Sequence, residues 1–589
     1  MPYSSVYILF YLLFCNLCTA QFIPSRYWVQ FTDKNNTPYT LSDPAAYLSQ
    51  KAIDRRIKQG ISIQQNDLPI DPAYIDSISN TGVKILNRSK WFNAISIFTN
   101  DSSLIDSVMT FTFVKKVEIA GKLKNNHPPM AEKNPKTFDK WQEEKLIAIT
   151  SANNAGNEYG QAYGQISMLG GDILHSMGYR GEGMVIAIMD AGFNKADTNP
   201  AFAKAFASNR VLGAWDFVNG NDSVYDDGEH GLFVFSIIAS DIPGVMVGTA
   251  PAASYWLLRT EDTSSEYIIE EDNWVAAAEF ADSAGADIIT TSLGYSTFNV
   301  ASQNHTYQDM DGNSTRITIG ADIAASKGIL VVNAAGNSGS SSWKYIIAPA
   351  DGDSVLTVGA VDNSGNYASF SSQGPAFDGR VKPNVVAQGL GTVTITGSGG
   401  IQSGSGTSYA APLIAGLSAC LWQTKPAAGS MDVYHAIEQS ADQYDNPDYF
   451  RGYGIPDYIY AYLALSGLPP DNDEDRDRIP DVKDKCPGTP YPAFVDSAGC
   501  PVNFDIAGFA KIVENPVGES WSYYYFSSTD QDITIVFFDL AGKEVLHQQL
   551  KLDAGSYWQI KIQGMDRLTQ GMYLMKISSG GNVAVRKLI

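Results

Sequence analysis

The chain has 589 residues, 44% of them hydrophobic, which is enough for three or four domains with packed cores. It carries 41 basic and 63 acidic residues, so its formal net charge is −22. This acidity argues against binding to nucleic acids or to anionic membrane surfaces, and it favours a soluble extracellular protein.

Residues 1–20 have the pattern of a secretory signal peptide. An apolar core at Val6–Phe14 precedes small residues at Cys18–Ala20, and such a core is too short to span a bilayer. The sequence therefore predicts export of a chain that begins near Gln21. No later stretch is long enough for a transmembrane segment.

Residues 21–121 alternate between strand and helix patterns. Strands are predicted at residues 27–31, 91–98 and 113–119, and helices at 44–60 and 102–110. This order predicts a small α+β domain of the split βαβ type. Residues 122–160 are polar with little periodicity, so they are predicted to form an exposed linker that proteases can cut.

Residues 161–468 show a longer alternation of the two patterns. Strands are predicted at 184–190, 255–259, 286–291 and 329–334, and helices at 230–239, 267–284 and 318–327. This alternation predicts an α/β domain with a mostly parallel sheet and helices on both faces. Three acidic residues of the helix at 267–284, Glu270, Glu271 and Asp272, are predicted to form a solvated face.

Four groups in this region are suited to acyl transfer. Asp190 ends an apolar strand, His230 begins an apolar helix, Asn337 follows another strand, and Ser408 opens a buried apolar helix. At a helix N-terminus, free N–H groups and the helix dipole stabilise the negative charge that forms when serine attacks a carbonyl. Ser408 taken alone is equally compatible with a helix N-cap.

The order Asp190, His230, Ser408, with Asn337 before the serine, resembles the subtilisin family of serine proteases. The resemblance implies that Asp190 orients His230, that His230 is the general base and acid, and that Ser408 attacks the substrate. It also implies that the Asn337 side chain completes the oxyanion hole.

The same resemblance implies how a polypeptide substrate binds. Its backbone would pair with the segment formed by Ser292, Leu293 and Gly294. Ala348–Pro349 is similar to the family's cis-proline turn behind the specificity pocket, and Ile346 and Ile347 beside it predict a shallow pocket. Three residues depart from the family pattern: Ala191, Leu232 and Phe233.

The element order of residues 21–121 is similar to the inhibitory propeptide of subtilisins. The resemblance implies a zymogen whose own propeptide inhibits the catalytic domain until the linker at 122–160 has been cut. An unrelated accessory domain is the alternative for this part of the chain.

Residues 469–503 are predicted to form a calcium-binding linker. Carboxylates at alternate positions bring oxygens round one loop, which suits Ca²⁺; they are Asp473, Asp475, Asp477, Asp481 and Asp484. The stretch resembles a thrombospondin type 3 repeat, and a metal-free acidic linker is the alternative. A disulfide between Cys486 and Cys500 fits an oxidising compartment, whereas Cys420 is predicted to be a buried core residue.

Residues 504–589 are rich in strands, predicted at 532–538, 557–562 and 572–577, and they indicate a small β-sandwich. Short motifs at Asn515–Val517, Gly542–Val545 and Arg586–Lys587 resemble the C-terminal sorting domain of the bacterial type IX secretion system. The resemblance implies recognition by the secretion machinery, and a secreted or surface-anchored protein. A carbohydrate-binding or adhesive module is the alternative.

The whole pattern predicts a secreted bacterial serine endopeptidase made as a zymogen. The alternative is a catalytically impaired surface protein of the same fold that acts as a binding or adhesion module. All four chemical groups are present, and this favours the enzyme.

Overall fold

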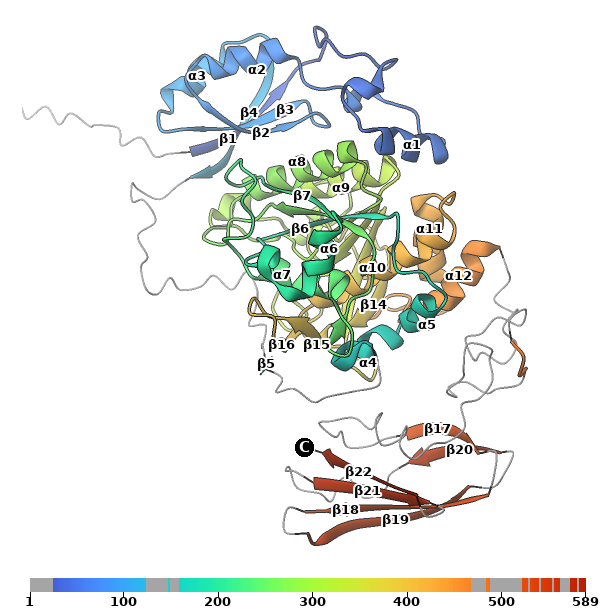
Figure 1. Cartoon of the computed structure of the whole chain (residues 1–589). Coiled ribbons are helices and arrows are strands. Elements are labelled where there is room, and N and C mark those ends of the chain that lie inside the picture. The colour runs from blue at the N-terminus through green and yellow to red at the C-terminus, as the bar shows by residue number, and fades with distance from the viewer. Residues whose placement is uncertain are drawn as a thin grey trace, which may run out of the picture.

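The structure is a computed structural model. It describes residues 25–122, 147–148, 158–467, 484–487, 522–527, 530–539, 542–552, 556–561, 573–579 and 582–588. An N-terminal α+β domain, a central α/β domain and a C-terminal β domain follow one another along the chain (Figure 1). The predicted signal peptide and most of the predicted linker at 122–160 lie outside the described residues.

The N-terminal domain is built on a four-stranded antiparallel sheet in the order β2-β3-β1-β4. Its strands are β1 (Ser25–Phe31), β2 (Lys84–Ser89), β3 (Ala94–Thr99) and β4 (Val114–Lys122). Alternate residues of β1 point to opposite faces. Tyr27 and Val29 pack with α2 (Pro72–Ser79) and α3 (Ser103–Met109), whereas Trp28 belongs to a core shared with the central domain.

The three strands and the second helix predicted for this domain are present, but α2 and β2 were missed. The predicted helix at 44–60 is two elements, a 3₁₀ turn at Pro44–Ala46 and α1 (Gln50–Lys58). Ser49 separates them because its side chain accepts a hydrogen bond from Ala52 N and so starts α1 as its N-cap.

The central domain contains a seven-stranded sheet in the order β14-β13-β12-β11-β6-β10-β7, and all six strand pairs are parallel. Its strands are β6 (Val185–Asp190), β7 (Val211–Asp216), β10 (Ser254–Arg259), β11 (Ile288–Thr291), β12 (Leu330–Ala334), β13 (Val355–Val361) and β14 (Val385–Gln388). The predicted α/β fold is therefore confirmed. The inner strands are buried along their whole length because helices cover both faces.

The helices pack in two groups, one on each face of the sheet. α7 (His230–Ala239) and α10 (Thr407–Thr424) share one core, and α8 (Ile269–Ala284) and α9 (Arg316–Ser326) share the other. The smaller helices are α4 (Tyr163–Ser167), α5 (Gly171–Ser176), α6 (Ala203–Ala207), α11 (Ser430–Gln439) and α12 (Tyr458–Ser466). The remaining strands are β5 (Ile147–Ala148), β8 (Asp241–Ile242), β9 (Met246–Val247), β15 (Leu390–Ile395) and β16 (Ile401–Ser405).

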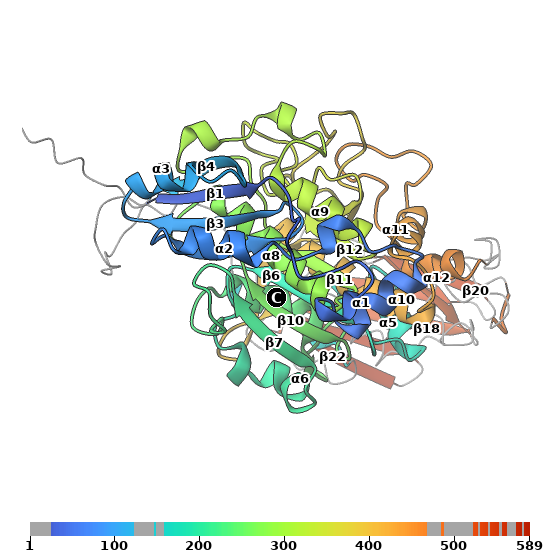
Figure 2. The same ribbon diagram turned by 90° about the horizontal axis from the view of Figure 1, so that it is seen from above.

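The N-terminal domain lies over α8 and α9 (Figure 2). The prediction that the acids of α8 form a solvated face is therefore wrong. Glu270 and Glu271 are completely buried and Asp272 is nearly so. Basic partners compensate the burial: His305 Nε2 lies 2.5 Å from Glu271 Oε1, and Arg316 Nε lies 3.2 Å from Asp272 Oδ1.

The C-terminal domain has two antiparallel sheets. One pairs β17 (Ser522–Ser527) with β20 (Ser556–Lys561), and the other has the order β19-β18-β21-β22, with β18 at Gln531–Phe538, β19 at Glu544–Leu552, β21 at Tyr573–Ser579 and β22 at Asn582–Leu588. Alternate residues of β18, namely Ile533, Ile535 and Phe537, are buried. The larger sheet therefore has an apolar face, as expected for a β-sandwich.

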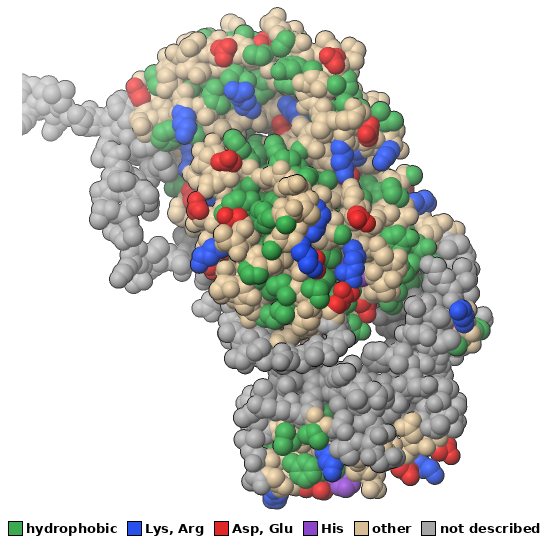
Figure 3. Space-filling model, in the orientation of Figure 1, with side chains coloured by type: hydrophobic (Ala, Val, Ile, Leu, Met, Phe, Trp, Pro, Cys, Tyr) green, Lys and Arg blue, Asp and Glu red, His purple; other side chains and the backbone are tan. Residues whose placement is uncertain are grey.

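The surface of the N-terminal and central domains mixes acidic, basic and hydrophobic side chains on the face seen in Figure 3. Within the described parts of the chain, no helix has the length and apolar character needed to cross a membrane.

Candidate active site

Asp190 lies at the carboxyl end of β6, in the middle of the sheet, where ligand sites of parallel α/β folds form. Its side chain is completely buried. Oδ1 accepts hydrogen bonds from Ala191 N and from His230 Nδ1, both at 2.7 Å. Burial raises the pKa of Asp190 above its ordinary value, while the imidazole and the two hydrogen bonds oppose the shift.

His230 is the first residue of α7 and is 7% exposed. Two glycines allow its helix to approach Asp190 this closely. A Cβ on Gly231 would lie 2.3 Å from Gly192 O, and a Cβ on Gly192 would lie 1.9 Å from Asp227 O. With Nδ1 bound to the carboxylate, the acceptor of a neutral imidazole is Nε2.

Ser408 is the second residue of α10 and is 2% exposed. Its Oγ donates to Ser292 O at 3.3 Å, and Ser292 Oγ donates to Ser408 O at 2.9 Å. These two bonds join the N-terminus of α10 to the segment that follows β11. The next residue, Tyr409, has its ring 6.3 Å from the His230 ring, so the first turn of α10 lies beside the Asp190–His230 pair.

Asn337 reaches the same helix terminus from the turn after β12. Its Oδ1 accepts from Thr407 N at 2.9 Å and from Thr407 Oγ1 at 3.0 Å, while Gly336 N donates to Thr407 Oγ1 at 3.1 Å. Because both donors are on Thr407, the amide oxygen is fixed and the Nδ2 hydrogens point elsewhere. The structure thus brings the four predicted catalytic groups to one edge of the sheet.

Arg259 supports the site and was missed in the sequence. It ends β10, the neighbour of β6, and its Nε donates to Ala191 O at 3.0 Å. The guanidinium also pairs with Asp216 at 2.8 Å and with Asp227 at 2.7 Å. The sequence offered one signal for this role: Arg259 is a basic residue at the end of an apolar strand. Because parallel strands end at the same edge of a sheet, Arg259 lies near Asp190 if the two strands are neighbours.

The second carboxylate oxygen of Asp190, Oδ2, differs from Oδ1 in its hydrogen bonding. Within the described residues, Asp190 Oδ2 is buried without a hydrogen-bond partner. The side chain of the next residue, Ala191, has no donor that could supply this hydrogen bond. The hydrogen bonds that hold this carboxylate, from Ala191 N and His230 Nδ1, are therefore both on Oδ1 within the described residues.

Ser292, Leu293 and Gly294 follow β11 directly, beside Ser408. Ile347 packs against this segment: its Cγ1 lies 2.8 Å from a Cβ built on Gly294 and its Cδ1 lies 3.0 Å from one built on Gly336. The peptide bond between Ala348 and Pro349 is cis, as predicted. Ile347 therefore fills the space between the ends of β11 and β12.

The predicted calcium loop lies mostly outside the described residues, which include Asp484 but not the other four aspartates. Asp484 Oδ1 accepts from Cys486 N at 2.7 Å. Cys486 is disulfide-bonded, and Cys500 lies outside the described residues, so the pairing stays a prediction. Cys420 is a free, buried thiol as predicted, and burial raises its pKa.

One other group could hold a cation by its geometry. Among the described residues, Glu261, Glu266 and Glu270 each offer a carboxylate oxygen within 4.8 Å of the others. The Tyr295 hydroxyl donates to Glu261, and Asp262 N donates to Glu270 at 2.8 Å. Tyr295 directly follows Gly294, so the three carboxylates lie near the segment formed by Ser292, Leu293 and Gly294.

The N-terminal domain contacts α8 through the turn between β2 and β3. Glu279 of α8 accepts hydrogen bonds from Ser89 Oγ at 2.6 Å, Lys90 N at 2.6 Å and Trp91 N at 3.0 Å. Burial raises the pKa of Glu279 to about 7, although Lys90 and these donors oppose the shift. Asn87 Nδ2 adds bonds to Phe217 O at 2.9 Å and to Asn273 Oδ1 at 2.8 Å.

Comparison with known families matches three parts of the chain. Residues 181–454 match the subtilase family, residues 26–137 match the peptidase S8 propeptide domain of Bacteroidota, and residues 515–589 match the secretion system C-terminal sorting domain. The predicted propeptide and type IX sorting domain are therefore present in this chain.

Curated relatives agree with the first match. Subtilisin E of Bacillus subtilis is 30% identical over 325 residues, which are 54% of this chain and 75% of the relative. Subtilisin of Bacillus pumilus is 31% identical over 298 residues, or 49% and 94% of the two chains. Thermophilic serine proteinase of Bacillus sp. (strain AK1) is 31% identical over 287 residues, or 48% and 62%.

Proposed function

Because the chain belongs to the subtilase family, we propose that it hydrolyses peptide bonds through an acyl-enzyme formed at Ser408. The family and the propeptide make it a secreted serine protease produced as a zymogen. The observation that carries the proposed chemistry is the 2.7 Å bond between His230 Nδ1 and Asp190 Oδ1, beside the N-terminus of α10.

In the proposed first step, Ser408 Oγ attacks the scissile carbonyl and His230 Nε2 takes its proton. This requires the hydroxyl proton to turn from Ser292 O toward His230. Asp190 keeps the imidazole in the tautomer whose Nε2 carries the lone pair that accepts the proton, and it stabilises the imidazolium. The oxyanion receives Asn337 Nδ2–H and the backbone N–H at the start of α10.

The tetrahedral intermediate then collapses, and His230 returns the proton to the leaving amine. Water attacks the acyl-enzyme with His230 as base, which frees the acid product and restores Ser408. Ser292, Leu293 and Gly294 are proposed to pair with the backbone of the substrate as an added strand. This pairing places the scissile bond near Ser408 because Ser292 and Ser408 are already hydrogen-bonded.

A fluorophosphonate probe that reacts with activated serines tests this proposal. The mature protein should be labelled at Ser408, and His230→Ala should abolish the labelling because the hydroxyl then has no base. Ser418→Ala is a matched control, since Ser418 lies on the same helix and bonds only Ile414 O and Tyr458 within the described residues. Failure of the wild-type protein to label supports the alternative, a binding protein on a subtilase fold.

We further propose the division of the chain that its composition predicts: signal peptide 1–20, propeptide 21–121, linker 122–160, catalytic domain 161–468, calcium-binding linker 469–503 and sorting domain 504–589. The propeptide inhibits the catalytic domain, and the active site of the same chain cuts the linker between Gly121 and Tyr163. The polar, breaker-rich composition of the linker supports its binding as an extended strand.

Two supporting roles complete the proposal. Ca²⁺ is held by Asp473, Asp475, Asp477, Asp481 and Asp484, and it stabilises the linker without entering the chemistry. A disulfide between Cys486 and Cys500 closes the same module. The sorting domain indicates secretion or attachment to the cell surface, and we propose that the secretion machinery recognises residues 504–589.

A further inference from the structure

Residues 32–71 form a long excursion between β1 and α2 that leaves the sheet of the propeptide. It carries α1 to the C-terminal ends of α8 and α9, next to the turn between β2 and β3, whose Lys90 contacts Asp282 and Ser283 of α8. Ser49 N donates to Ser283 O of α8 at 2.9 Å. The propeptide therefore contacts this part of the catalytic domain through two of its own elements, the turn between β2 and β3 and α1.

Arg55 of α1 joins the C-terminal ends of two catalytic-domain helices. Its Nε donates to Lys327 O at 3.1 Å, at the C-cap of α9, and its Nη1 donates to Ala286 O at 2.5 Å, just beyond α8. Nη2 donates to Asp282 O at 3.2 Å and pairs with Asp282 Oδ1 at 2.5 Å. A cation is favoured here because both helices present unpaired carbonyls and the negative end of their dipoles.

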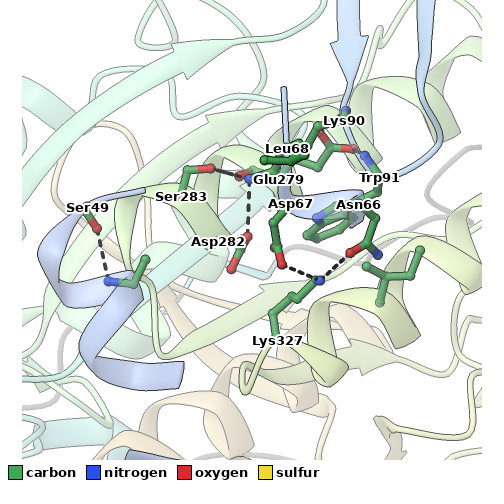
Figure 4. Close-up of polar contacts among 12 residues, drawn as sticks. Ser49, Asn66, Asp67, Leu68, Lys90, Trp91, Glu279, Asp282, Ser283 and Lys327 are labelled. Atoms are coloured by element: carbon green, nitrogen blue, oxygen red, sulfur yellow. Dashed lines mark hydrogen bonds and ion pairs between the residues drawn. The ribbon is translucent and has the colours of Figure 1, made fainter. Parts of the chain in front are cut away.

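Arg56, Asp67 and Lys327 extend this contact into a buried ion-pair cluster. Arg56 Nη2 lies 2.8 Å from Asp67 Oδ1 and 2.9 Å from Asp282 Oδ2. Lys327 Nζ lies between Asn66 Oδ1, at 2.6 Å, and Asp67 Oδ2, at 3.1 Å (Figure 4). Both carboxylates are completely buried.

Lys90 links the cluster to the first contact. Its Nζ lies 3.4 Å from Asp282 Oδ2 and 2.7 Å from Ser283 Oγ (Figure 4). Burial alone would raise the pKa of Asp282, but Lys90, Arg55 and Arg56 hold it below its ordinary value. Charges removed from water in this way are stable only while every partner is present.

We propose that α1 is a latch: a second docking element that keeps the cleaved propeptide on the catalytic domain, with Arg55 as its anchor and the C-terminal ends of α8 and α9 as its receptor. The proposal rests on the proposed function, because a latch matters only once the linker has been cut. Two linked contacts hold more tightly than either does alone, since release of one leaves the other at high effective concentration. Cutting the linker therefore does not by itself free the active site.

The full-length chain provides the test, in the variants Arg55→Ala and Lys58→Ala. Arg55 is a suitable probe because its side chain makes the hydrogen bonds to the catalytic domain described above. Lys58 is an exposed cation of the same helix, so it serves as the matched control. The measured quantity is the lag between linker cleavage, followed by electrophoresis, and the appearance of peptidase activity. We expect Arg55→Ala to shorten the lag ~10-fold or more, because it removes one of the two guanidinium groups that pair with the buried Asp282 carboxylate and also the donor to Lys327 O, Ala286 O and Asp282 O. Lys58→Ala should leave the lag unchanged.

Hydrogen–deuterium exchange on a Ser408→Ala background gives a second readout that needs no catalysis. Adding Arg55→Ala should accelerate exchange in residues 50–58 and leave the propeptide sheet protected. An unchanged lag, or the same shortening in Lys58→Ala, overturns the proposal. If Arg55→Ala yields no active protein, or if the wild type is inactive and the proposed function fails, the exchange decides: faster exchange in α1 supports the latch, and unchanged exchange overturns it.

Discussion

The active-site edge and the propeptide-covered face of the catalytic domain are built on different physical terms. At the edge, a hydrogen bond joins Asp190 and His230, and their surroundings are held by glycine contacts, by neutral hydrogen bonds around Thr407 and by the ion pairs of Arg259. On the covered face, Arg55, Arg56 and Lys327 meet two buried carboxylates.

These different interactions correspond to how long the contacts of each region must persist. The edge has to keep its geometry in the mature protease, and packing and short hydrogen bonds are available with or without a propeptide. The covered face must separate, and buried ion pairs are suited to that because each partner regains water when the two sides part. A stable site and a removable inhibitor therefore require different interactions.

The strongest way to sharpen this comparison is to remove the nucleophile. Ser408→Ala should lower turnover roughly 10⁶-fold, the scale known for loss of a triad serine in a related protease, and a full-length chain starting near Gln21 should accumulate. The fold and the covered face should be unaffected. Electrophoresis of the purified protein over time provides the measurement, and maturation at the wild-type rate would show that another protease cuts the linker.

Removal of the proposed oxyanion-hole donor, the Asn337 side chain, has a smaller expected effect. Asn337→Ala should lower kcat by ~10²–10³ with little change in KM, the range known for such a donor in a related protease. Asn337→Asp keeps an oxygen for Thr407 but loses the N–H, so it should fall about as far. Steady-state kinetics with a peptide substrate measures both, and a fully active Asp variant would mean that Asn337 only holds Thr407.

The prediction for the specificity pocket tests packing at the edge. Ile347 fills the space between Gly294 and Gly336, so the protease should prefer small residues on the acyl side of the cleaved bond. Ile347→Gly should raise kcat/KM for Phe or Leu relative to Ala about 10–100-fold, because a few methylene groups are then accommodated. A series of peptides that differ at this one residue gives the ratio, with Ile346→Val as a control for buried volume. An unchanged ratio would place the pocket elsewhere.

Much of the edge is predictable from the sequence because its signals are local. The end of β6 at Asp190 and the start of α7 at His230 agree with the predicted elements to the residue, since an apolar run that ends in Asp-Ala-Gly and a His-Gly before an apolar run each mark a boundary. Ser408 was expected at a helix start and is the second residue of α10. The elements that carry these residues were thus predicted, whereas their arrangement as a catalytic site stays a proposal.

The covered face could not be predicted in the same way. Glu271 is buried by His305, and Asp282 by Arg55, which is 227 residues away in the sequence. A helical pattern records which residues share a face, but it does not record which distant element covers that face. This is why the acids of α8 were expected in solvent and are instead paired.

The smallest expected effect concerns the pH dependence of the covered face. Burial raises the pKa of Glu279 to about 7 in the complex, and the pKa should return to its ordinary value once water reaches the carboxyl. A pKa that is higher in the complex means that the complex binds the proton more tightly, so this contribution to affinity is complete at low pH and is lost as the pH rises through about 7. The pKa of Asp282 is shifted downward. The contribution of Asp282 to the affinity is therefore complete at pH values above the ordinary pKa of an aspartate.

Propeptide release after linker cleavage should therefore be about 3–10-fold faster at pH 8 than at pH 5.5. Glu279→Gln, which is neutral at both values and of similar shape, should remove most of that difference while Asp282 and the α1 contacts continue to hold. The lag before peptidase activity, corrected for the intrinsic pH dependence of fully mature enzyme, is the measurement. Equal corrected lags at the two pH values, or a Gln variant that keeps the wild-type ratio, would show that Glu279 stays ionised in the complex and that its hydrogen bonds from Ser89, Lys90 and Trp91 outweigh its burial.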